Sequence, residues 1–240
     1  MKRSKGMDKR RHVDPPEHKV VVSVIQQKGG VGKTTLSVHL AQMIADLRPK
    51  WQITVADADP QQSALQWVER GRSHGFDQVD GVSIAQDGEG KKLRKELQNI
   101  DADVVVIDLP PAIESISLRA ALYADIMLVP VGASLLDIEA AQAAVNVCHE
   151  AMDLDPRKRM LLVPSRIRNG TAAARELRPV LEEWGEVSKS TLSLRVAYSD
   201  AAVSGEGIHT YAPQSDAYRE VAYLTREILE IIEEREGESA

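Results

Sequence analysis

The most restrictive feature of the sequence is a glycine-rich segment that lies between an apolar run and an amphipathic run. Residues 20–25 read VVVSVI, a β-branched pattern typical of a parallel strand that is buried on both faces. Residues 26–32 contain three glycines, and residues 33–47 then repeat apolar side chains at helical spacing. A strand that passes through a tight turn into a helix is the first half of a β-α-β unit. The sequence therefore predicts a parallel sheet covered by helices.

The same alternation of strands and helices continues to the end of the chain. Further short apolar runs predict strands at residues 53–56, 82–84, 104–107, 126–129 and 160–163. Helical patterns occur at residues 33–47, 91–98, 138–152 and 217–231, the last with Asp216 as its N-cap. Because there is no internal repeat and no linker, we expect one doubly wound, mostly parallel α/β domain over residues 20–235. A basic tail (1–19) and an acidic end (236–240) flank this domain.

The composition excludes several classes of protein. Of the 240 residues, 43% are hydrophobic and 28% are charged, which is ordinary for a globular domain. The net charge of −6 excludes a uniformly basic nucleic-acid binder, although not a local basic patch. The single cysteine, Cys148, excludes a disulfide framework, an iron–sulfur cluster held by this chain's own cysteines and a cysteine-rich zinc site. No apolar run approaches the roughly 20 residues of a membrane span, so we expect a cytoplasmic protein.

The segment QQKGGVGKTT, residues 26–35, carries the strongest chemical signal. Its position between a strand and a helix is the one that a phosphate-binding loop requires, because backbone N–H groups and the helix N-terminus then surround the anion. We expect Lys33 to reach the β- and γ-phosphates of a nucleotide, Thr34 to ligate Mg²⁺ and Thr35 to bond the α-phosphate. The alternative is a glycine-rich turn that binds no nucleotide. The backbone contacts of the loop are assigned to Gly29, Gly30, Val31 and Gly32.

One departure from the ordinary phosphate loop is informative. The usual pattern, G-x-x-x-x-G-K-[S/T], has glycine where this chain has Gln27, and a second lysine, Lys28, follows. The pattern K-G-G-x-G-K-[S/T] resembles the deviant Walker A motif of the ParA/MinD family of ATPases. In that family the first lysine reaches across a dimer interface to the phosphates of the partner's ATP. The resemblance therefore implies a P-loop NTPase fold, ATP as the cofactor, and catalytic roles for Lys33 and for Lys28, which would make dimerisation depend on ATP.

Two carboxylates, Asp57 and Asp59, follow the second predicted strand. At positions i and i+2 beyond a strand end, both can face the phosphate crevice at the carboxyl edge of the sheet. The stretch D-A-D-P-Q resembles switch I of the same family. That resemblance implies that Asp59 orients the attacking water and that Asp57 lies near the hydration shell of Mg²⁺. The alternative is a polar turn with an Asx hydrogen bond before Pro60.

A third element follows the apolar strand VVVI at residues 104–107. The next residue, Asp108, has the form of a Walker B element, in which a rigid strand delivers one carboxylate to the Mg²⁺ shell. The family usually reads D-x-P-P here, and DLPP matches. The resemblance spans about residues 20–232 and loosens at PSRIRN, residues 164–169, where we assign Arg166 as the nucleotide contact. It also takes in residues 124–131, 136–137 and 196–205.

The hypothesis of DNA binding rests on local charge. Residues 157–200 hold nine basic side chains against five acidic ones, a net of +4 within an acidic protein. Two copies in an ATP-bound dimer would present this charge twice, which would favour nonspecific binding to double-stranded DNA. The contacts that we expect are Arg166, Arg168 and Arg195. The alternative is ordinary solvated helix faces, because three glutamates (Glu182, Glu183 and Glu186) lie in the same stretch.

Three other types of protein in this family do not fit the sequence. A MinD-type protein ends in a basic amphipathic helix that binds anionic lipid, whereas residues 227–238 are acidic, so we expect no membrane binding. Iron–sulfur carriers and nitrogenase-like reductases need cysteine ligands. Residues 1–19 are too short for the helix-turn-helix domain of the larger partition ATPases. Residues 1–19 carry a net charge of +4, which is typical of a solvated tail or, alternatively, of an arm that adds affinity for phosphate backbones.

We therefore expect a ParA-type ATPase that dimerises on ATP, binds DNA nonspecifically and positions a cargo over the nucleoid. A cargo-bound, ParB-like adaptor would stimulate its slow hydrolysis and release the subunits. The expected cargo is a plasmid or chromosome locus, and the alternative is a protein assembly such as a carboxysome or a chemoreceptor cluster. Two alternatives come from other classes: a soluble metabolic ligase that uses the loop on a small acid, and a nucleotide-switched scaffold that does not hydrolyse ATP.

Overall fold

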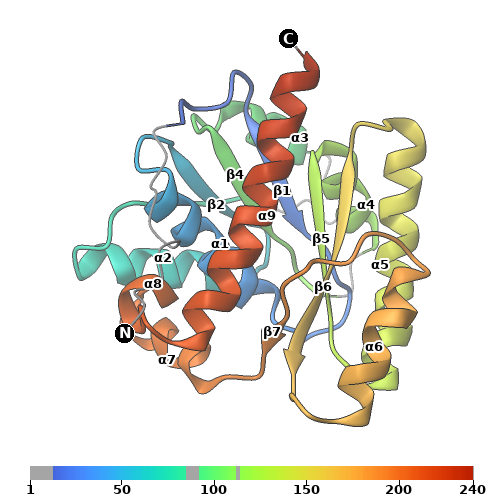
Figure 1. Ribbon diagram of the computed structural model, residues 1–240. Helices are drawn as coiled ribbons and strands as arrows, with labels where there is room; N and C mark the ends of the chain where they lie inside the picture. The colour runs from blue at the N-terminus through green and yellow to red at the C-terminus, as the bar shows by residue number, and fades with distance from the viewer. Residues whose placement is uncertain (1–12, 85–91, 112–113, 240) are drawn as a thin grey trace.

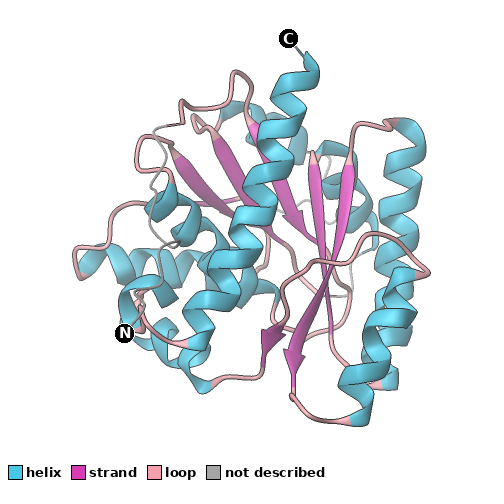
Figure 2. Cartoon of the chain, in the orientation of Figure 1, coloured by secondary structure: helices cyan, strands magenta, loops and turns pink. Residues whose placement is uncertain are grey.

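The computed structural model describes residues 13–84, 92–111 and 114–239. Within them, seven strands form one sheet in the order β3-β2-β4-β1-β5-β6-β7, in which every adjacent pair is parallel. Helices cover both faces of the sheet (Figures 1 and 2). The strands are β1 (Val20–Val24), β2 (Ile53–Asp57), β3 (Asp80–Ser83), β4 (Val104–Asp108), β5 (Ile126–Val131), β6 (Arg159–Ile167) and β7 (Leu192–Ser193). The helices are α1 (Lys33–Leu47), α2 (Ser63–Ser73), α3 (Leu93–Asn99), α4 (Glu114–Tyr123), α5 (Leu135–Leu154), α6 (Ala172–Glu182), α7 (Val196–Ser204), α8 (Ile208–Tyr211) and α9 (Asp216–Ser239).

The predicted fold class, a parallel sheet flanked by helices, is confirmed. All six predicted strands and all four predicted helices are present, and α1 begins and ends at the predicted residues. The structure adds α2, α4, α6, α7, α8 and β7, for which the sequence analysis predicted no element. Several of these are short or carry mixed polar sequence, so their apolar periodicity is weak.

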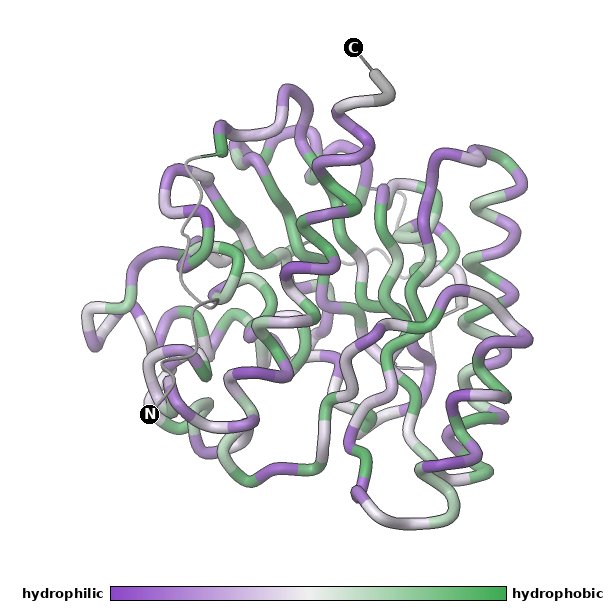
Figure 3. Tube along the Cα trace, viewed as in Figure 1, coloured by the Kyte–Doolittle hydropathy of each residue, from purple (hydrophilic) through white to green (hydrophobic). Residues whose placement is uncertain are grey.

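Alternating side chains along the strands divide the hydrophobic core into two layers. Val20, Val22 and Val24 of β1 contribute to the layer under α1, α2, α7, α8 and α9. Val21 and Ile25 contribute to the opposite layer, under α3, α4, α5 and α6. The central strands are therefore buried on both faces, which explains why their sequences are continuous apolar runs. Figure 3 shows the strands mostly in the hydrophobic colour and the outer helices in alternating colours.

A pair of glycines sets the distance between α2 and the segment that follows α7. Gly205 has a φ of +80°, and a Cβ built on it would lie 2.2 Å from the backbone nitrogen of Gly71. A side chain at this position would therefore meet both an unfavourable backbone conformation and a backbone clash. The carbonyl of Gly205 also accepts a hydrogen bond from Gln42 Nε2 at 3.2 Å. These contacts hold the end of α7 against α1 and α2.

The described part of the predicted N-terminal tail contacts the domain. Val13 packs against the core, and its carbonyl accepts a hydrogen bond from Trp51 Nε1 at 3.2 Å. Residues 1–12 of that tail, and residue 240 of the predicted acidic end, lie outside the described residues. α9 carries the chain to Ser239, beyond the predicted end of the helix. Across the described part of the chain, every helix is too short or too polar to cross a membrane.

Candidate functional site

The candidate site lies at the carboxyl edge of the sheet, where the loops after β1, β2, β4 and β6 meet. The sheet order places β1 between β4 and β5. The chain leaves β1 for one half of the sheet and later enters the other half through β5. This change of direction marks the crevice where open α/β sheets bind ligands. The loop after β1 occupies the crevice and leads directly into α1 (Figure 1).

The phosphate loop, residues 26–32, has a backbone conformation that requires glycine at two positions. Gly30 has a φ of +76° and Gly32 a φ of +98°, values that residues with a Cβ rarely adopt. α1 begins at Lys33, and its N-cap is Gly32, which has no side chain with which to cap the helix. The first N–H groups of α1 therefore remain available to an anion, which the helix dipole also favours.

Lys33 points back along the phosphate loop. Its Nζ donates to the carbonyl oxygen of Lys28 at 3.1 Å, and its side chain is buried. Burial lowers the pKa of Lys33, while the charges of Asp108 and Asp59 act in the opposite direction. The structure thus brings the predicted catalytic residues Lys33 and Asp59 close enough to interact.

Asp108, at the end of β4, is hydrogen-bonded to the first turns of α1. Thr34 Oγ1 donates to Asp108 Oδ2 at 2.7 Å, and Ser37 Oγ donates to Asp108 Oδ1 at 3.0 Å. Burial raises the pKa of Asp108 to about 7 against the lowering effect of these two bonds, and the nearby charge of Asp57 adds to the rise. Ser37 was not among the predicted site residues. The sequence does carry a signal for Ser37: it lies three residues after Thr34, a spacing that places the two hydroxyl groups on one face of the helix.

Asp57 lies beside Asp108 in the register of the sheet. Its Oδ1 accepts the N–H of Asp59 and its Oδ2 accepts the N–H of Leu65, both at 2.9 Å. Burial raises the pKa of Asp57 more than these hydrogen bonds lower it. Two neighbouring carboxylates with raised pKa values favour a nearby cation, and oxygen donors suit a hard cation such as Mg²⁺. Asp57 also organises the turn that leads into α2.

These side chains do not form a complete metal site by themselves. Among the residues that the structure describes, no group of three or more histidine, cysteine, aspartate or glutamate side chains is arranged to hold an ion. Mg²⁺ usually keeps several waters and takes further ligands from substrate phosphates. The Thr34–Asp108 pair therefore fits an Mg²⁺ ion that arrives with a nucleotide.

Asp59 is half-buried in the turn that follows β2. Its Oδ1 accepts the N–H of Gln61 at 2.9 Å. This is an Asx turn, the alternative that the sequence left open. The same carboxylate acts on the pKa of Lys33. The turn is compatible with a position beside the phosphate loop, and the catalytic role of Asp59 stays a prediction.

Lys28, the lysine that distinguishes this loop, is paired with a residue of α5. Its Nζ lies 2.5 Å from Asp137 Oδ1, and Asp137 Oδ2 accepts the Ser134 hydroxyl at 2.5 Å. Gly132 leaves room for this carboxylate, because a Cβ there would lie 2.4 Å from Asp137 Oδ2. Lys28 and Asp137 both line an open surface cavity of about 510 Å³. The ammonium group therefore lies on the outer side of the loop, where another molecule can approach it.

The end of β6 holds the other side of the phosphate loop. Ser165 Oγ donates to the Val31 carbonyl at 3.2 Å, and Arg166 Nη1 donates to the Gly30 carbonyl. Arg166 has a φ of +56°, which is uncommon for a residue with a Cβ. Its methylene groups lie beside Gly32. The predicted nucleotide contact therefore adjoins the loop directly.

A cavity of about 200 Å³ lies next to Thr35, between α1 and the segment 192–198. Its lining includes His39 of α1, Arg195 and Tyr198, and Arg166 separates it from the cavity beside Lys28. Its position next to the predicted α-phosphate contact suits the nucleoside part of a nucleotide. This cavity was not predicted from the sequence, because its lining comes from α1, β6, β7, α7 and α9 and no contiguous motif marks it.

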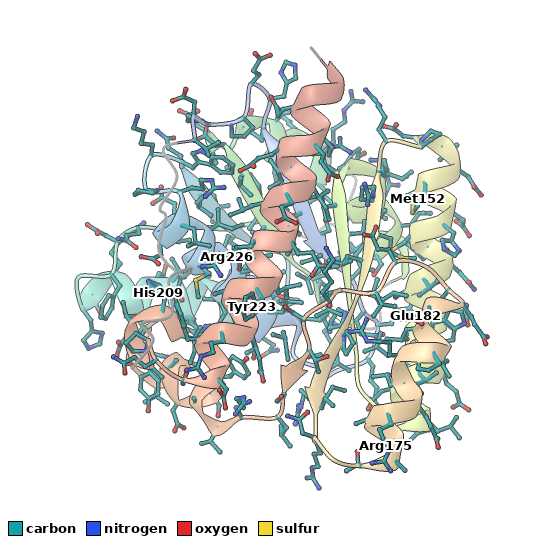
Figure 4. All side chains as sticks on the ribbon, viewed as in Figure 1. Met152, Arg175, Glu182, His209, Tyr223 and Arg226 are labelled. Atoms are coloured by element: carbon teal, nitrogen blue, oxygen red, sulfur yellow. The ribbon has the colours of Figure 1, made fainter. Side chains whose placement is uncertain are left out.

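The predicted basic surface is divided between two edges of the sheet. Residues 157–159 lie at the start of β6, whereas Arg166 and Arg168 lie at its end. A strand rises about 3.3 Å per residue, so the two groups are more than ~20 Å apart. Arg175 lies in the first turns of α6, close to the end of β6 (Figure 4). The second group alone adjoins the phosphate loop.

Arg195, the third predicted DNA contact, is held within the protein. Its Nη2 and Nε donate to Glu220 Oε1 at 2.8 and 3.0 Å, and Nη2 lies 3.6 Å from Asp216 Oδ2. Its side chain is 31% exposed. Arg168, by contrast, is exposed. DNA contact by Arg166, Arg168 and Arg195 stays a prediction.

Comparison with known proteins gives a consistent result. The model of the CobQ/CobB/MinD/ParA nucleotide binding domain matches residues 22–208. The maintenance of carboxysome distribution protein A of Gloeobacter kilaueensis is 32% identical over 209 residues, which cover 84% of this chain and 92% of that protein. The chromosome-partitioning ATPase Soj of Thermus thermophilus is 27% identical over 242 residues, which cover 89% of this chain and 96% of that protein.

A solved structure shares the fold over most of the chain. It is that of a plasmid partition protein from Borrelia burgdorferi B31 bound to AMPPNP, with a TM-score of 0.69 and 16% identity, covering 89% of this chain and 99% of that one. At this level of identity the likeness concerns the fold alone. The residues predicted to contact the nucleotide, Mg²⁺ and DNA all lie within the matched residues 22–208.

Proposed function

Because the chain belongs to the CobQ/CobB/MinD/ParA family of nucleotide-binding domains, we propose that it is an ATPase that binds ATP with Mg²⁺ at the phosphate loop. The observation that carries this proposal is the convergence of three strand ends on one loop. Lys33 lies within that loop, Asp108 bonds Thr34 at its helix, and Asp59 is near enough to act on the pKa of Lys33. The proposed ligand explains why a cation, a hydroxyl and two carboxylates are gathered there.

In the proposed complex, Thr34 and Asp108 would hold Mg²⁺, and Asp57 would lie near the ion. When bound, Mg²⁺ would neutralise part of the charge on the phosphate oxygens. The backbone N–H groups of residues 29–35 and the N-terminus of α1 bind the phosphates. Lys33 exchanges its bond to the Lys28 carbonyl for phosphate oxygens.

For hydrolysis, we assign Asp59 to the attacking water. Its carboxylate would orient one water molecule toward the terminal phosphate, while Lys33 stabilises the charge that develops on the phosphate oxygens. The Asx turn supports this role, because the hydrogen bond from the Gln61 N–H fixes one carboxylate oxygen. A side chain held in this way loses little conformational freedom when the water binds.

We further propose that ATP closes a dimer in which Lys28 leaves Asp137 and reaches the partner's nucleotide. The half-exposed Lys28–Asp137 pair supports this proposal, because a polyanion would compete well for a cation that one carboxylate holds near the surface. Exposed apolar side chains on segments around the loop also support it, since such a surface favours a partner. These side chains are Leu135, Leu136, Leu194 and Val196.

The proposed dimer binds double-stranded DNA without reading its sequence, through Arg166 and Arg168, the two predicted contacts whose side chains are exposed. A cargo-bound, ParB-like adaptor would then stimulate hydrolysis and release the subunits from the nucleoid. The name of the Thermus thermophilus relative supports a chromosome locus as cargo. The name of the more identical Gloeobacter kilaueensis relative supports a protein assembly as the second candidate. Imaging a host that lacks the gene distinguishes these two cargoes. Faulty segregation of DNA would indicate a DNA locus, and mislocalised protein assemblies would indicate a protein cargo.

The test of DNA binding uses a fluorescent duplex of random sequence. Its anisotropy is measured with ATP, with ADP and without nucleotide, at two salt concentrations, for the native chain and Lys28→Ala. The proposal predicts binding that requires ATP and Lys28 and weakens steeply with salt, because phosphate contacts release counterions. Binding under none of these conditions would contradict the DNA-positioning function. The metabolic ligase and the nucleotide-switched scaffold would then be the next hypotheses.

A further inference from the structure

The cavity next to Thr35 has one wall that no sequence motif marks. This wall, residues 192–198, consists of β7 and the first residues of α7 and includes Arg195 and Tyr198. It lies across the cavity from α1, which begins at the phosphate loop. A short two-residue strand offers few ladder hydrogen bonds. Its position therefore depends on side-chain contacts with other elements.

Glu220 of α9 provides most of these contacts. Its Oε1 accepts Ser193 Oγ at 2.7 Å and the two Arg195 nitrogens at 2.8 and 3.0 Å. Its Oε2 accepts the Ser193 N–H at 2.9 Å and the Tyr198 hydroxyl at 2.7 Å. The Glu220 side chain is 15% exposed, so the loss of these partners would leave a nearly buried charge unpaired. One carboxylate thus fixes three residues of the wall.

Burial alone would raise the pKa of Glu220, but the hydrogen bonds from Arg195, Ser193 and Tyr198 outweigh it and hold the pKa below its usual value. The carboxylate is therefore charged at neutral pH, and its pairing with Arg195 is ionic. The Tyr198 carbonyl also lies 3.3 Å from His39 Nε2 on α1. The wall is therefore anchored to α9 on one side and to α1 on the other.

The Glu220 contacts fix the orientation of the Arg195 guanidinium. Both Nε and Nη2 of Arg195 bond the same carboxylate, which restricts the plane of the group. Arg195 lines the 200 Å³ cavity on one side and an open groove of about 510 Å³ on the other. Tyr223 and Arg226 of α9, labelled in Figure 4, line the groove but not the cavity. A planar cation held at the edge of a cavity is a surface against which an aromatic base packs well.

We propose that Arg195 is a nucleobase-binding residue of this protein and that Glu220 is the positioning residue that holds it at the cavity. The proposal rests on the proposed function, since it requires that a nucleotide occupies the phosphate loop. It gives Arg195 a role different from the DNA contact that the sequence predicts. Two carboxylates already surround its guanidinium, so little net charge remains for a phosphate backbone.

The experiment compares two ligands that share phosphates but differ in the base. Titration calorimetry measures the affinity of the folded protein for Mg²⁺–ATP and for Mg²⁺–tripolyphosphate, and steady-state assays give KM and kcat. The variants are Arg195→Lys, which keeps the charge but loses the plane, Arg195→Ala, and Glu220→Gln. The matched control is Arg219→Lys. Arg219 also pairs with Asp216 and lines the groove, but it does not line the nucleoside cavity.

We expect Arg195→Ala to weaken ATP binding about 10-fold, the size of a partly desolvated cation–π contact. Arg195→Lys and Glu220→Gln should weaken it by about 3-fold or more, because each disturbs the guanidinium plane while retaining a polar group. Tripolyphosphate affinity and kcat at saturating ATP should change by less than about twofold, since the contact concerns the base rather than the phosphates. Arg219→Lys should bind both ligands as the native chain does.

Two results would overturn the proposal. The first is native ATP affinity in Arg195→Ala; if the ATP-loaded variant then also bound DNA more weakly, Arg195 would be a DNA contact. The second is an equal loss of affinity for ATP and for tripolyphosphate, which would show that Arg195 only maintains the structure. A failure of the proposed function can be distinguished from a failure of this inference. In that case the native chain would bind no ATP, and Lys33→Ala would not change the result of the titration.

Discussion

The two ends of the candidate nucleotide site are built in different ways. The phosphate loop and the start of α1, residues 26–35, form a contiguous segment in which three glycines, two lysines and two threonines lie within ten positions. The opposite wall, residues 192–198, is held by Glu220 of α9 and by His39 of α1, which are distant in sequence. A contiguous segment displays its chemistry in the sequence. A wall held by distant residues acquires its chemistry only when the chain folds.

The largest effect is expected at the phosphate-loop end. Asp59→Ala should lower the turnover of ATP about 10³-fold, because the variant lacks the carboxylate that orients the water. ATP affinity should change by less than about threefold, since Asp59 is not assigned to the phosphates. Phosphate release and titration calorimetry measure the two quantities. Asp80→Ala is the control, because Asp80 is an exposed carboxylate on β3 that is paired with Arg72 of α2. Normal turnover by Asp59→Ala would show that another group orients the water.

At the other end, His39 makes the anchoring of the wall sensitive to pH. The Ile208 N–H donates to His39 Nδ1 at 3.2 Å, so the ring is neutral and its proton lies on Nε2, toward the Tyr198 carbonyl. Burial lowers the pKa of His39 to about 4, from the usual 6.5. Between these values the unfolded chain binds more protons than the folded one. The free energy of unfolding should therefore fall as the pH drops from 6.5 toward 4, by about 3 kcal/mol in total.

Urea unfolding at several pH values tests this prediction. The comparison is between the native chain and His39→Gln, and the quantity of interest is the difference in slope with pH rather than the stability itself. The native chain should lose more stability on acidification than the variant, since glutamine does not titrate. Parallel curves would show that the His39 ring does not resist protonation in the folded protein.

A smaller loss of stability is expected where α2 meets the end of α7. Gly205→Ala should lower the free energy of unfolding by about 2–3 kcal/mol, because the added Cβ meets the Gly71 backbone at a positive φ. Gly75→Ala is the matched control, since Gly75 has a φ of +87° but open space around its Cβ position. Its loss should be about 1 kcal/mol, the conformational cost alone. Equal losses for the two variants would mean that the contact between the glycines is not tight.

The smallest effect is expected for the pair that holds Lys28. Asp137→Asn should strengthen ATP-dependent dimerisation about 3- to 5-fold, because an ion pair near the surface contributes only about 1 kcal/mol. Sedimentation with ATP measures the dimer affinity. Asp155→Asn is the control, because it also removes an aspartate from an ion pair, with Arg157, at the opposite edge of the sheet. An unchanged or weaker dimer would show that Asp137 does not compete for Lys28.

The sequence predicted the fold well where a strand is buried on both faces. β1 and β4 are continuous apolar runs for that reason, and they were identified with nearly correct ends. β7 has two residues and α8 has four, so neither is long enough to show a periodicity. The α6 sequence was interpreted as a charged surface because its two buried leucines, Leu177 and Leu181, are outnumbered by polar residues.

The same distinction applies to the candidate site. Lys33, Thr34 and Asp108 meet as the motifs indicated, because each motif fixes a residue to a strand end and the sheet brings strand ends together. The pairing of Lys28 with Asp137 and the enclosure of Arg195 by Glu220 were not predicted. Both depend on helix packing between residues that are more than 20 positions apart in sequence. No local pattern encodes such a contact.

The most direct test of ATP-dependent dimerisation is the molar mass of the protein in solution, measured by light scattering on the hydrolysis-deficient variant Asp59→Ala. The measurement is made with ATP, with ADP, and with ATP after the further substitution Lys28→Ala. We predict twice the monomer mass with ATP alone, and the monomer mass in the other two cases. A monomer that binds ATP without associating, or a dimer that forms whatever the nucleotide and without Lys28, would contradict the proposed role of this lysine.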